Sequence, residues 1–213
     1  IFPFYWMIIT AFKTYSEAIQ TPPTLWPQNF TLEAFTNIFS RGIDITQYAI
    51  NSVVVTLSVI AIQLVVMVPA SYAFSKRRFP LQGVLFGIVL IGQITYISVY
   101  LMMSKAKLIN SLWPQILPLG ANAFGIFMLR QGFKQIPDEI IESARLDNAS
   151  EAQIMTRICL PMCKSSMITI AMFSFIGTWN AYFWPLVMTN SDKFRPLTLY
   201  IEKLKQEVEQ GIM

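Results

Sequence analysis

Five stretches of this 213-residue chain contain no charged residue, and four of them are long enough to cross a membrane. These stretches are residues 1–12, 45–75, 79–104, 108–129 and 165–191. A helix needs roughly 20 consecutive apolar residues to cross the hydrocarbon core of a bilayer, and only the first stretch is shorter. Charged residues make up 13% of the chain, whereas a soluble domain has about 25%. The sequence therefore predicts an all-α, polytopic membrane protein built as a helical bundle.

Within these stretches we expect spans at about 45–75, 81–104, 112–129 and 165–189. Residues 1–12 are a separate case, because a helix of that length reaches only about 18 Å, short of the roughly 30 Å core. We therefore expect residues 1–12 to be part of a longer first span, and the chain to be a fragment in that respect.

Orientation follows from the basic residues, because cytoplasmic loops carry an excess of lysine and arginine. Lys76-Arg77-Arg78 lies in the tight loop after the second expected span, which predicts a cytoplasmic position for that loop. Alternation then places residues 130–164 inside and both 13–44 and 190–213 outside.

The tail after the last span has two patterns. Leu197, Leu199 and Ile201 alternate with other residues as in a strand. Residues 202–207 alternate charges and apolar residues as in a surface helix.

Composition also excludes several kinds of chemistry. The chain has no histidine, the commonest general base and metal ligand, and two cysteines form neither a disulfide framework nor a four-ligand zinc site. It lacks the GxxxxGK[ST] pattern that cradles ATP phosphates, and its net charge of +4 is small. We therefore expect no enzyme activity of its own, no cofactor or metal, and no nucleic-acid partner.

Residues 136–161 predict two short helices around a turn. Pro137, followed by two acidic residues, suits a helix start, and Asp147-Asn148 suits its end, because asparagine tolerates the left-handed conformation. Ser150 with Gln153 forms a capping-box pattern for the second helix, which we expect to end at Pro161. By pattern alone, the segment could equally be an amphipathic loop at the membrane interface.

The order of residues in this segment resembles the signature of a known protein family. It is similar to the cytoplasmic signature of permease subunits of binding-protein-dependent ABC importers, which runs roughly E-A-A-x-x-D-G-A, a spacer, then I-x-L-P-L-x-x-P. The residues that match at the same spacing are Glu142, Ala144, Asp147, Ala149, Ile158, Leu160 and Pro161. Asn148 stands where the family has glycine. Trp179-Asn180 and Pro185-Leu186 look like the carbohydrate-uptake branch, of the maltose and glycerol-phosphate permease type.

The resemblance implies the fold of an ABC importer permease, with residues 1–213 as a single transmembrane permease domain and 136–161 as a cytoplasmic coupling helix-turn-helix. It also implies a further span after residue 213, in the multi-pass plasma (inner) membrane of a bacterium or archaeon. The implied partners, besides membrane lipid, are a second homologous permease, two ATPase subunits and an extracytoplasmic solute-binding protein. The implied function is ATP-driven import of a sugar or sugar-like solute. The alternative is a secondary transporter or channel that needs no ATPase, and residues 142–161 discriminate between the two.

In the implied coupling segment, Glu142 and Asp147 can meet basic groups of the ATPase, with Asn148 supplying the turn. Ile140, Ile141 and Ala144 either fill a groove of that partner or pack on the permease's own cytoplasmic ends, and we expect both in part. Polar residues inside spans are candidates for lining a pathway, although they also bond neighbouring helices. The candidates for pathway or substrate contact are Asn51, Gln93, Tyr96, Trp179 and Asn180.

Overall fold

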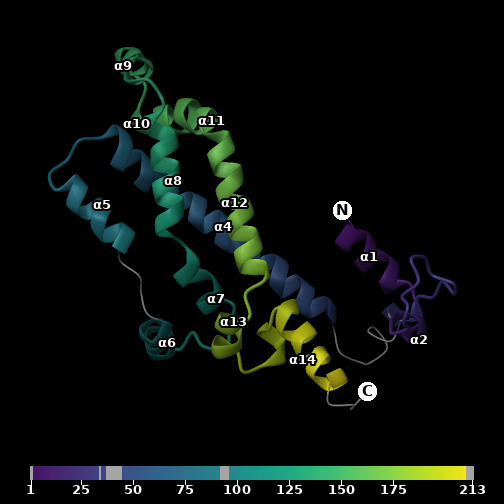
Figure 1. Cartoon of the computed structure of the whole chain (residues 1–213). Coiled ribbons are helices and arrows are strands. Elements are labelled where there is room, and N and C mark those ends of the chain that lie inside the picture. Colours follow the sequence, from purple (N-terminus) through teal and green to yellow (C-terminus); the bar gives the residue numbers. More distant parts are fainter. Residues whose placement is uncertain (1, 34, 37–44, 92–95, 210–213) are drawn as a thin grey trace. The chain divides into compact units, whose positions relative to one another are not determined.

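The computed structural model describes residues 2–33, 35–36, 45–91 and 96–209, and in these residues the regular structure is helical throughout. The chain divides into two units, residues 1–47 and 48–213, which are described separately (Figure 1). The first unit contains α1 (Phe2–Ala11) and α2 (Tyr15–Ala18). The loop after α2 is organised by Glu17, whose carboxylate accepts hydrogen bonds from the hydroxyl of Thr24 at 2.7 Å and the backbone N–H of Gln28 at 2.9 Å.

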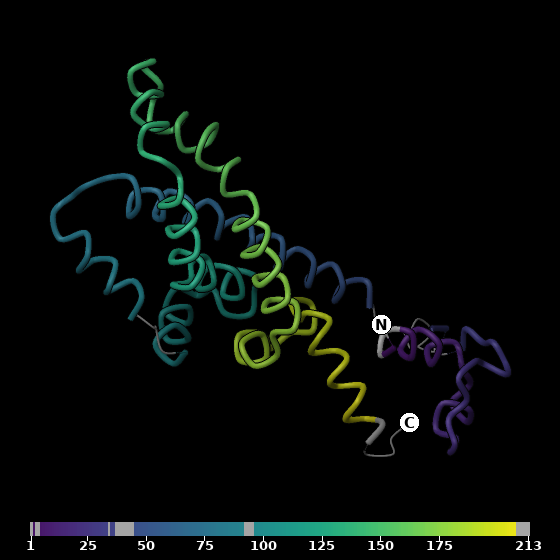
Figure 2. Tube along the Cα trace, turned by 45° about the horizontal axis from the view of Figure 1, so that its top comes forward, coloured from purple at the N-terminus to yellow at the C-terminus, as the bar shows by residue number. Residues whose placement is uncertain are grey.

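The second unit contains the helices from α4 onward. In chain order they are α4 (Ile45–Lys76, whose first residues precede the unit boundary), α5 (Gln82–Ile91), α6 (Tyr96–Lys105), α7 (Trp113–Ile116), a 3-10 turn (Leu117–Leu119), α8 (Ala123–Lys134), α9 (Asp138–Leu146), α10 (Glu151–Gln153), a π-helical stretch (Ile154–Cys159), α11 (Leu160–Met162), α12 (Lys164–Trp179), α13 (Phe183–Met188), a 3-10 turn (Asp192–Phe194) and α14 (Leu197–Glu209). Both views place α9 at one end of this unit and α13 and α14 at the other (Figures 1 and 2).

One helix among the described residues, α4, is long and apolar enough to cross a membrane unaided. Two helix pairs also qualify if each bent pair counts as one span. The first is α5 with α6, and the second is residues 151–162 with α12, a pair bent by 80°. The residues between α5 and α6, 92–95, lie outside the described part of the chain.

Two expected spans are interrupted where prolines fall. The run 112–129 divides into α7, a 3-10 turn and α8, and α8 continues to Lys134. Pro114 and Pro118 lie in the interrupted part, and each lacks the N–H that an internal helical position needs. The run 165–189 divides between α12 and α13, because Pro185 in a continuous helix would clash with the carbonyl of residue 181.

Two smaller expectations were wrong. Residues 197–201 are not a strand but the first turns of α14. The hydroxyl of Ser52 accepts a hydrogen bond from the backbone N–H of Leu197, the first residue of α14, at 2.8 Å. The second helix of the helix-turn-helix does not end at Pro161 but at Met162. Since a proline ring clashes with the carbonyl four residues earlier, the π-helical stretch before it widens the turn and accommodates the ring.

The main apolar core joins α4, α8 and residues 136–170. Its buried members are Met67, Val68, Tyr72, Ile126, Leu129, Phe133, Ile136, Ile141, Ala144, Ile154, Cys159, Cys163 and Ile170. Close approach of α8 and the start of α12 favours glycine at position 132, because a Cβ there would lie 3.2 Å from Ser166 Oγ and 3.3 Å from Cys163 Sγ. The residues around the helix-turn-helix therefore share one core with the apolar helices.

Candidate functional site

The helix-turn-helix at residues 136–162 is fastened to the end of α4. The Lys76 ammonium donates to the backbone carbonyl of Ile136 at 2.5 Å and forms an ion pair with Asp138 at 2.6 Å. The hydrogen bond and positive charge of Lys76 hold the pKa of Asp138 below its ordinary value. The basic triplet 76–78 and the signature segment therefore lie at the same end of the second unit, as the expected topology requires.

A second attachment is centred on Glu151. Its Oε2 accepts the hydroxyl of Tyr72 at 2.5 Å, and its Oε1 accepts the Nε–H of Arg145 at 3.0 Å and lies 3.4 Å from Arg77 Nη1. Partial burial acts to raise the pKa of Glu151, but the hydrogen bonds from Tyr72 and Arg145 and the nearby positive charges outweigh burial and lower the pKa. Glu151 is therefore ionised at neutral pH.

The turn between the two helices has the geometry of a Schellman motif. The N–H of Ala149 donates to the carbonyl of Ala144, and that of Asn148 donates to the carbonyl of Arg145, both at 3.0 Å. Asn148 has φ of 58°, the left-handed conformation in which asparagine replaces glycine at modest cost. The capping box of Ser150 and Gln153 is present, so the helix-turn-helix prediction is confirmed.

The two faces of α9 have different surroundings. Ile141 and Ala144 belong to the main core of this chain, with 2% and 9% of their surfaces exposed. Ile140 is 38% exposed and Leu146 is 84% exposed, while Glu142, Asp147 and Asn148 are exposed on the surface. Leu146 was missed as a candidate from the sequence, although a helical projection places it, with Glu142, opposite the buried pair.

The two cysteines of the segment are packing residues. Cys159 and Cys163 are free and buried, and burial raises the pKa of the Cys159 thiol to about 11. Because the thiolate is the reactive form of cysteine, Cys159 is unreactive at neutral pH.

A cavity of about 480 Å³ lies farther along the second unit, beside the interrupted part of the 112–129 run. Its wall includes aromatic and uncharged polar side chains: Tyr96, Phe124, Phe173, Trp184, Gln63, Asn122, Ser174 and Thr178. None of the described residues that line it is charged. The cavity can therefore hold a neutral solute without burying an unpaired charge.

Gln63 fixes the wall of this cavity. Its Nε2–H donates to the carbonyl of Leu119 at 2.7 Å, and its Oε1 accepts the hydroxyl of Ser174. Gln63 therefore joins α4 both to the 3-10 turn after α7 and to α12.

The candidates for pathway contact are scattered. Tyr96 lines the cavity, with its ring 5.4 Å from that of Trp184, whereas Trp179 and Asn180 are outside its lining, although Thr178 beside them is in it. Asn51 is buried away from the cavity, with its amide donating to the carbonyls of Lys193 at 2.8 Å and Arg195 at 3.0 Å. Gln93 lies outside the described residues.

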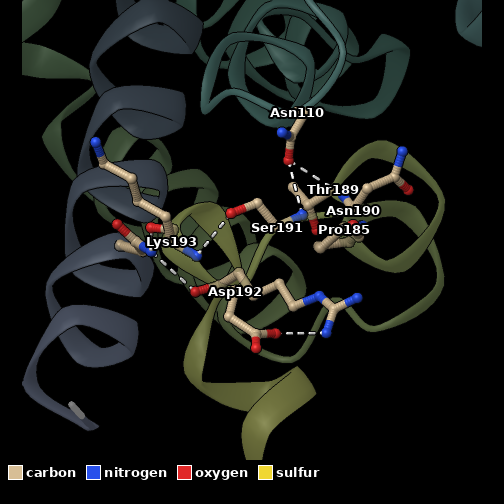
Figure 3. Close-up of polar contacts among 9 residues, drawn as sticks. Asn110, Pro185, Thr189, Asn190, Ser191, Asp192 and Lys193 are labelled. Carbon is tan, nitrogen blue, oxygen red and sulfur yellow. Dashed lines mark hydrogen bonds and ion pairs between the residues drawn. The ribbon is translucent and has the colours of Figure 1, made fainter. Parts of the chain in front are cut away.

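At the end of the unit opposite α9, polar contacts join two loops (Figure 3). The Asn110 side-chain carbonyl accepts the backbone N–H groups of Asn190 at 3.2 Å and Ser191 at 2.8 Å. The backbone N–H of Asn110 donates to the backbone carbonyl of Met188 at 2.9 Å. Trp184 adds a further link, because its indole N–H donates to the carbonyl of Pro114 at 2.8 Å. These contacts hold the loop after α13 against the loop after α6.

Three comparisons relate this chain to known proteins. A family model described as binding-protein-dependent transport system inner membrane component matches residues 6–204. The inner membrane ABC transporter permease protein YcjP of Escherichia coli (strain K12) is 34% identical over 208 residues, covering 90% of this chain and 71% of the relative. The lactose transport system permease protein LacG of Rhizobium radiobacter is 31% identical over 211 residues, covering 96% and 76%.

Among solved structures, the chain is similar to one in the crystal structure of a bacterial ABC transporter involved in the import of the acidic polysaccharide alginate. The TM-score is 0.85 at 24% sequence identity, and the match covers 94% of this chain and 72% of that one. This similarity shows the fold.

Proposed function

The chain belongs to the family of binding-protein-dependent transport system inner membrane components, and from that membership we propose that it forms part of the pathway by which an ABC importer carries a sugar or sugar-like solute across the membrane, driven by a separate ATPase. It is a permease subunit and not an enzyme. Its proposed partners are a second homologous permease, two ATPase subunits and an extracytoplasmic solute-binding protein. Its proposed location is the bacterial or archaeal plasma membrane, which it crosses several times.

The proposal of ATPase coupling rests on the solvent-exposed face of α9, called here its outward face. Glu139, Glu142, Ser143 and Leu146 are all exposed, and their spacing of i, i+3, i+4 and i+7 puts them on one helical face. An 84% exposed leucine among carboxylates suits a partner groove that combines an apolar pocket with basic residues. A secondary transporter or channel has no need of such a face.

Exchanging Glu142 for lysine should weaken ATPase retention about tenfold, which corresponds to about 1.4 kcal/mol, because an attractive charge becomes a repulsive one. The measurement is co-purification of the ATPase subunits with the full-length permease from membranes, at several salt concentrations. Glu202→Lys is the matched control, since it makes the same exchange on α14 at the opposite end of the unit (Figure 1). If the wild-type protein retains no ATPase, the secondary-transporter alternative is favoured.

The cavity supports a neutral, hydroxyl-rich solute. Its wall combines the rings of Tyr96 and Trp184 with the polar side chains of Asn122 and Thr178, and aromatic faces pack against the C–H surfaces of sugars while the polar groups bond hydroxyls. The relative LacG is named as a lactose permease, which agrees with this class of solute. Tyr96 is therefore the pathway candidate that the cavity favours.

Removing the Tyr96 ring with Tyr96→Ala should lower solute uptake about fivefold, because about 1 kcal/mol of aromatic contact is lost on the pathway. Uptake of radiolabelled solute into cells expressing the complete importer measures this. Tyr15→Ala is a matched control, since Tyr15 is also exposed but lies in the first unit. Equal uptake by the Tyr96 variant and the wild type would remove Tyr96 from the proposed pathway.

A further inference from the structure

Glu151, the first residue of α10, contacts side chains from α4, the residue after α4, and α9. Tyr72 belongs to α4, Arg77 directly follows α4, and Arg145 belongs to α9. All three contact the one carboxylate, at 2.5 Å, 3.4 Å and 3.0 Å respectively. Both carboxylate oxygens are therefore engaged, and charge-assisted hydrogen bonds of this kind are short and strong.

The Tyr72 side of this cluster is held in the core. Tyr72 is buried, and its ring meets that of Phe133 on α8 edge to face, with the centroids 6.2 Å apart. Because protein cores are close-packed, the phenol hydroxyl cannot follow Glu151 unless α4 moves with it. Glu151 itself is the first residue of α10, directly after the turn that follows α9.

The two attachments of the helix-turn-helix are at different points of α9. Lys76 fastens the start of α9 through Ile136 and Asp138, and Glu151 fastens its end through Arg145. The Lys76 attachment has one buried ammonium and an exposed carboxylate, Asp138. The Glu151 attachment differs in that one partly buried carboxylate contacts three side chains.

We propose that Glu151 is the positioning residue through which movement of α9 at the ATPase interface is passed to α4, and so to the cavity wall that Gln63 of α4 forms. This inference rests on the ATPase coupling proposed above. Without the Glu151 contacts, α9 still presents its outward face and binds the ATPase, but its displacement is taken up within the turn. ATP hydrolysis then continues while less solute is moved.

The test measures solute transported per ATP hydrolysed by the complete importer, reconstituted in vesicles with its ATPase and solute-binding protein. Glu151→Gln should retain the ATPase and hydrolyse ATP, with at least a fivefold lower ratio of solute to ATP. Glu151→Asp should recover part of the ratio, because it keeps the charge. Ser150→Ala is the structural control: it removes the neighbouring capping box but none of the Glu151 contacts, and should leave the ratio within twofold of the wild type.

Tyr72→Phe is a second variant, which removes only one hydroxyl and serves if Glu151→Gln does not assemble. It should also lower the ratio, by about twofold. Unchanged ratios in the assembled variants, with ATPase retained, would overturn the role of Glu151 alone. Failure of the wild-type protein to retain an ATPase would instead overturn the proposed coupling and this inference with it.

Discussion

Leu146→Asp is expected to release the ATPase from the complex while the permease itself stays folded. Leu146 is 84% exposed, so its replacement removes no contact from the permease core. In the proposed complex the leucine is buried in the partner, which contributes about 1.5–3 kcal/mol, and a buried unpaired carboxylate in its place costs more. Since 1.4 kcal/mol is a factor of ten, we expect the dissociation constant to rise about a hundredfold or more.

Surface-captured permease in detergent, titrated with purified ATPase, measures this dissociation constant. Ile201→Asp provides the comparison, because Ile201 is another exposed aliphatic residue on a surface helix, α14, and should not change ATPase binding. Undiminished ATPase binding by the Leu146 variant would mean that the outward face of α9 is not the docking surface.

Ala144→Trp should have the opposite result and destabilise the permease even when no ATPase is present. Ala144 lies two residues before Leu146 but is 9% exposed and packs in the main core. Overpacking a core by a few methylene groups costs about 1–3 kcal/mol, and an indole exceeds that volume. We expect a loss of about 3 kcal/mol or more, equivalent to a fall in Tm on the order of 10 °C for a chain of this size.

Thermal unfolding of the full-length permease in detergent checks this expectation. Ser143→Trp is the matched variant, since Ser143 is exposed and lies on the outward face. It should melt like the wild type but fail to bind the ATPase. Wild-type melting of Ala144→Trp would show that α9 does not pack on the core through this residue.

The helix-turn-helix could be predicted from the sequence because its signals are local. The proline and acidic residues at its start, Asn148 at the turn and the Ser150–Gln153 capping box each act within a few residues of chain. The sequence did not indicate which face of α9 packs inward. Ile140 and Ile141 are equally apolar, and only the position of the core distinguishes them. As a result Leu146, the most exposed apolar residue of the segment, was missed.

The cavity could not be predicted, because it depends on where uncharged runs are interrupted. Absence of charge indicates that a run suits an apolar environment, but says nothing about continuity of the helix. Pro114, Pro118 and Pro185 were visible signals of interruption. The hydrogen bonds of Gln63 to Leu119 and Ser174 join residues 56 and 111 positions apart, and no local pattern encodes such pairs.

The 80° bend between residues 151–162 and α12 forms a corner, here called the elbow, between a short arm, residues 151–162, and a long arm, α12. Ile154 and Ile170, one in each arm, are packed in the same core, so we expect the two arms to turn together. α12 has 16 residues, or about 24 Å of length, and a rotation of about 10° at the elbow sweeps its far end through about 4 Å. That far end contains Thr178 and Gly177 of the cavity wall. A small turn of the short arm would thereby become a displacement of about 4 Å at the cavity wall.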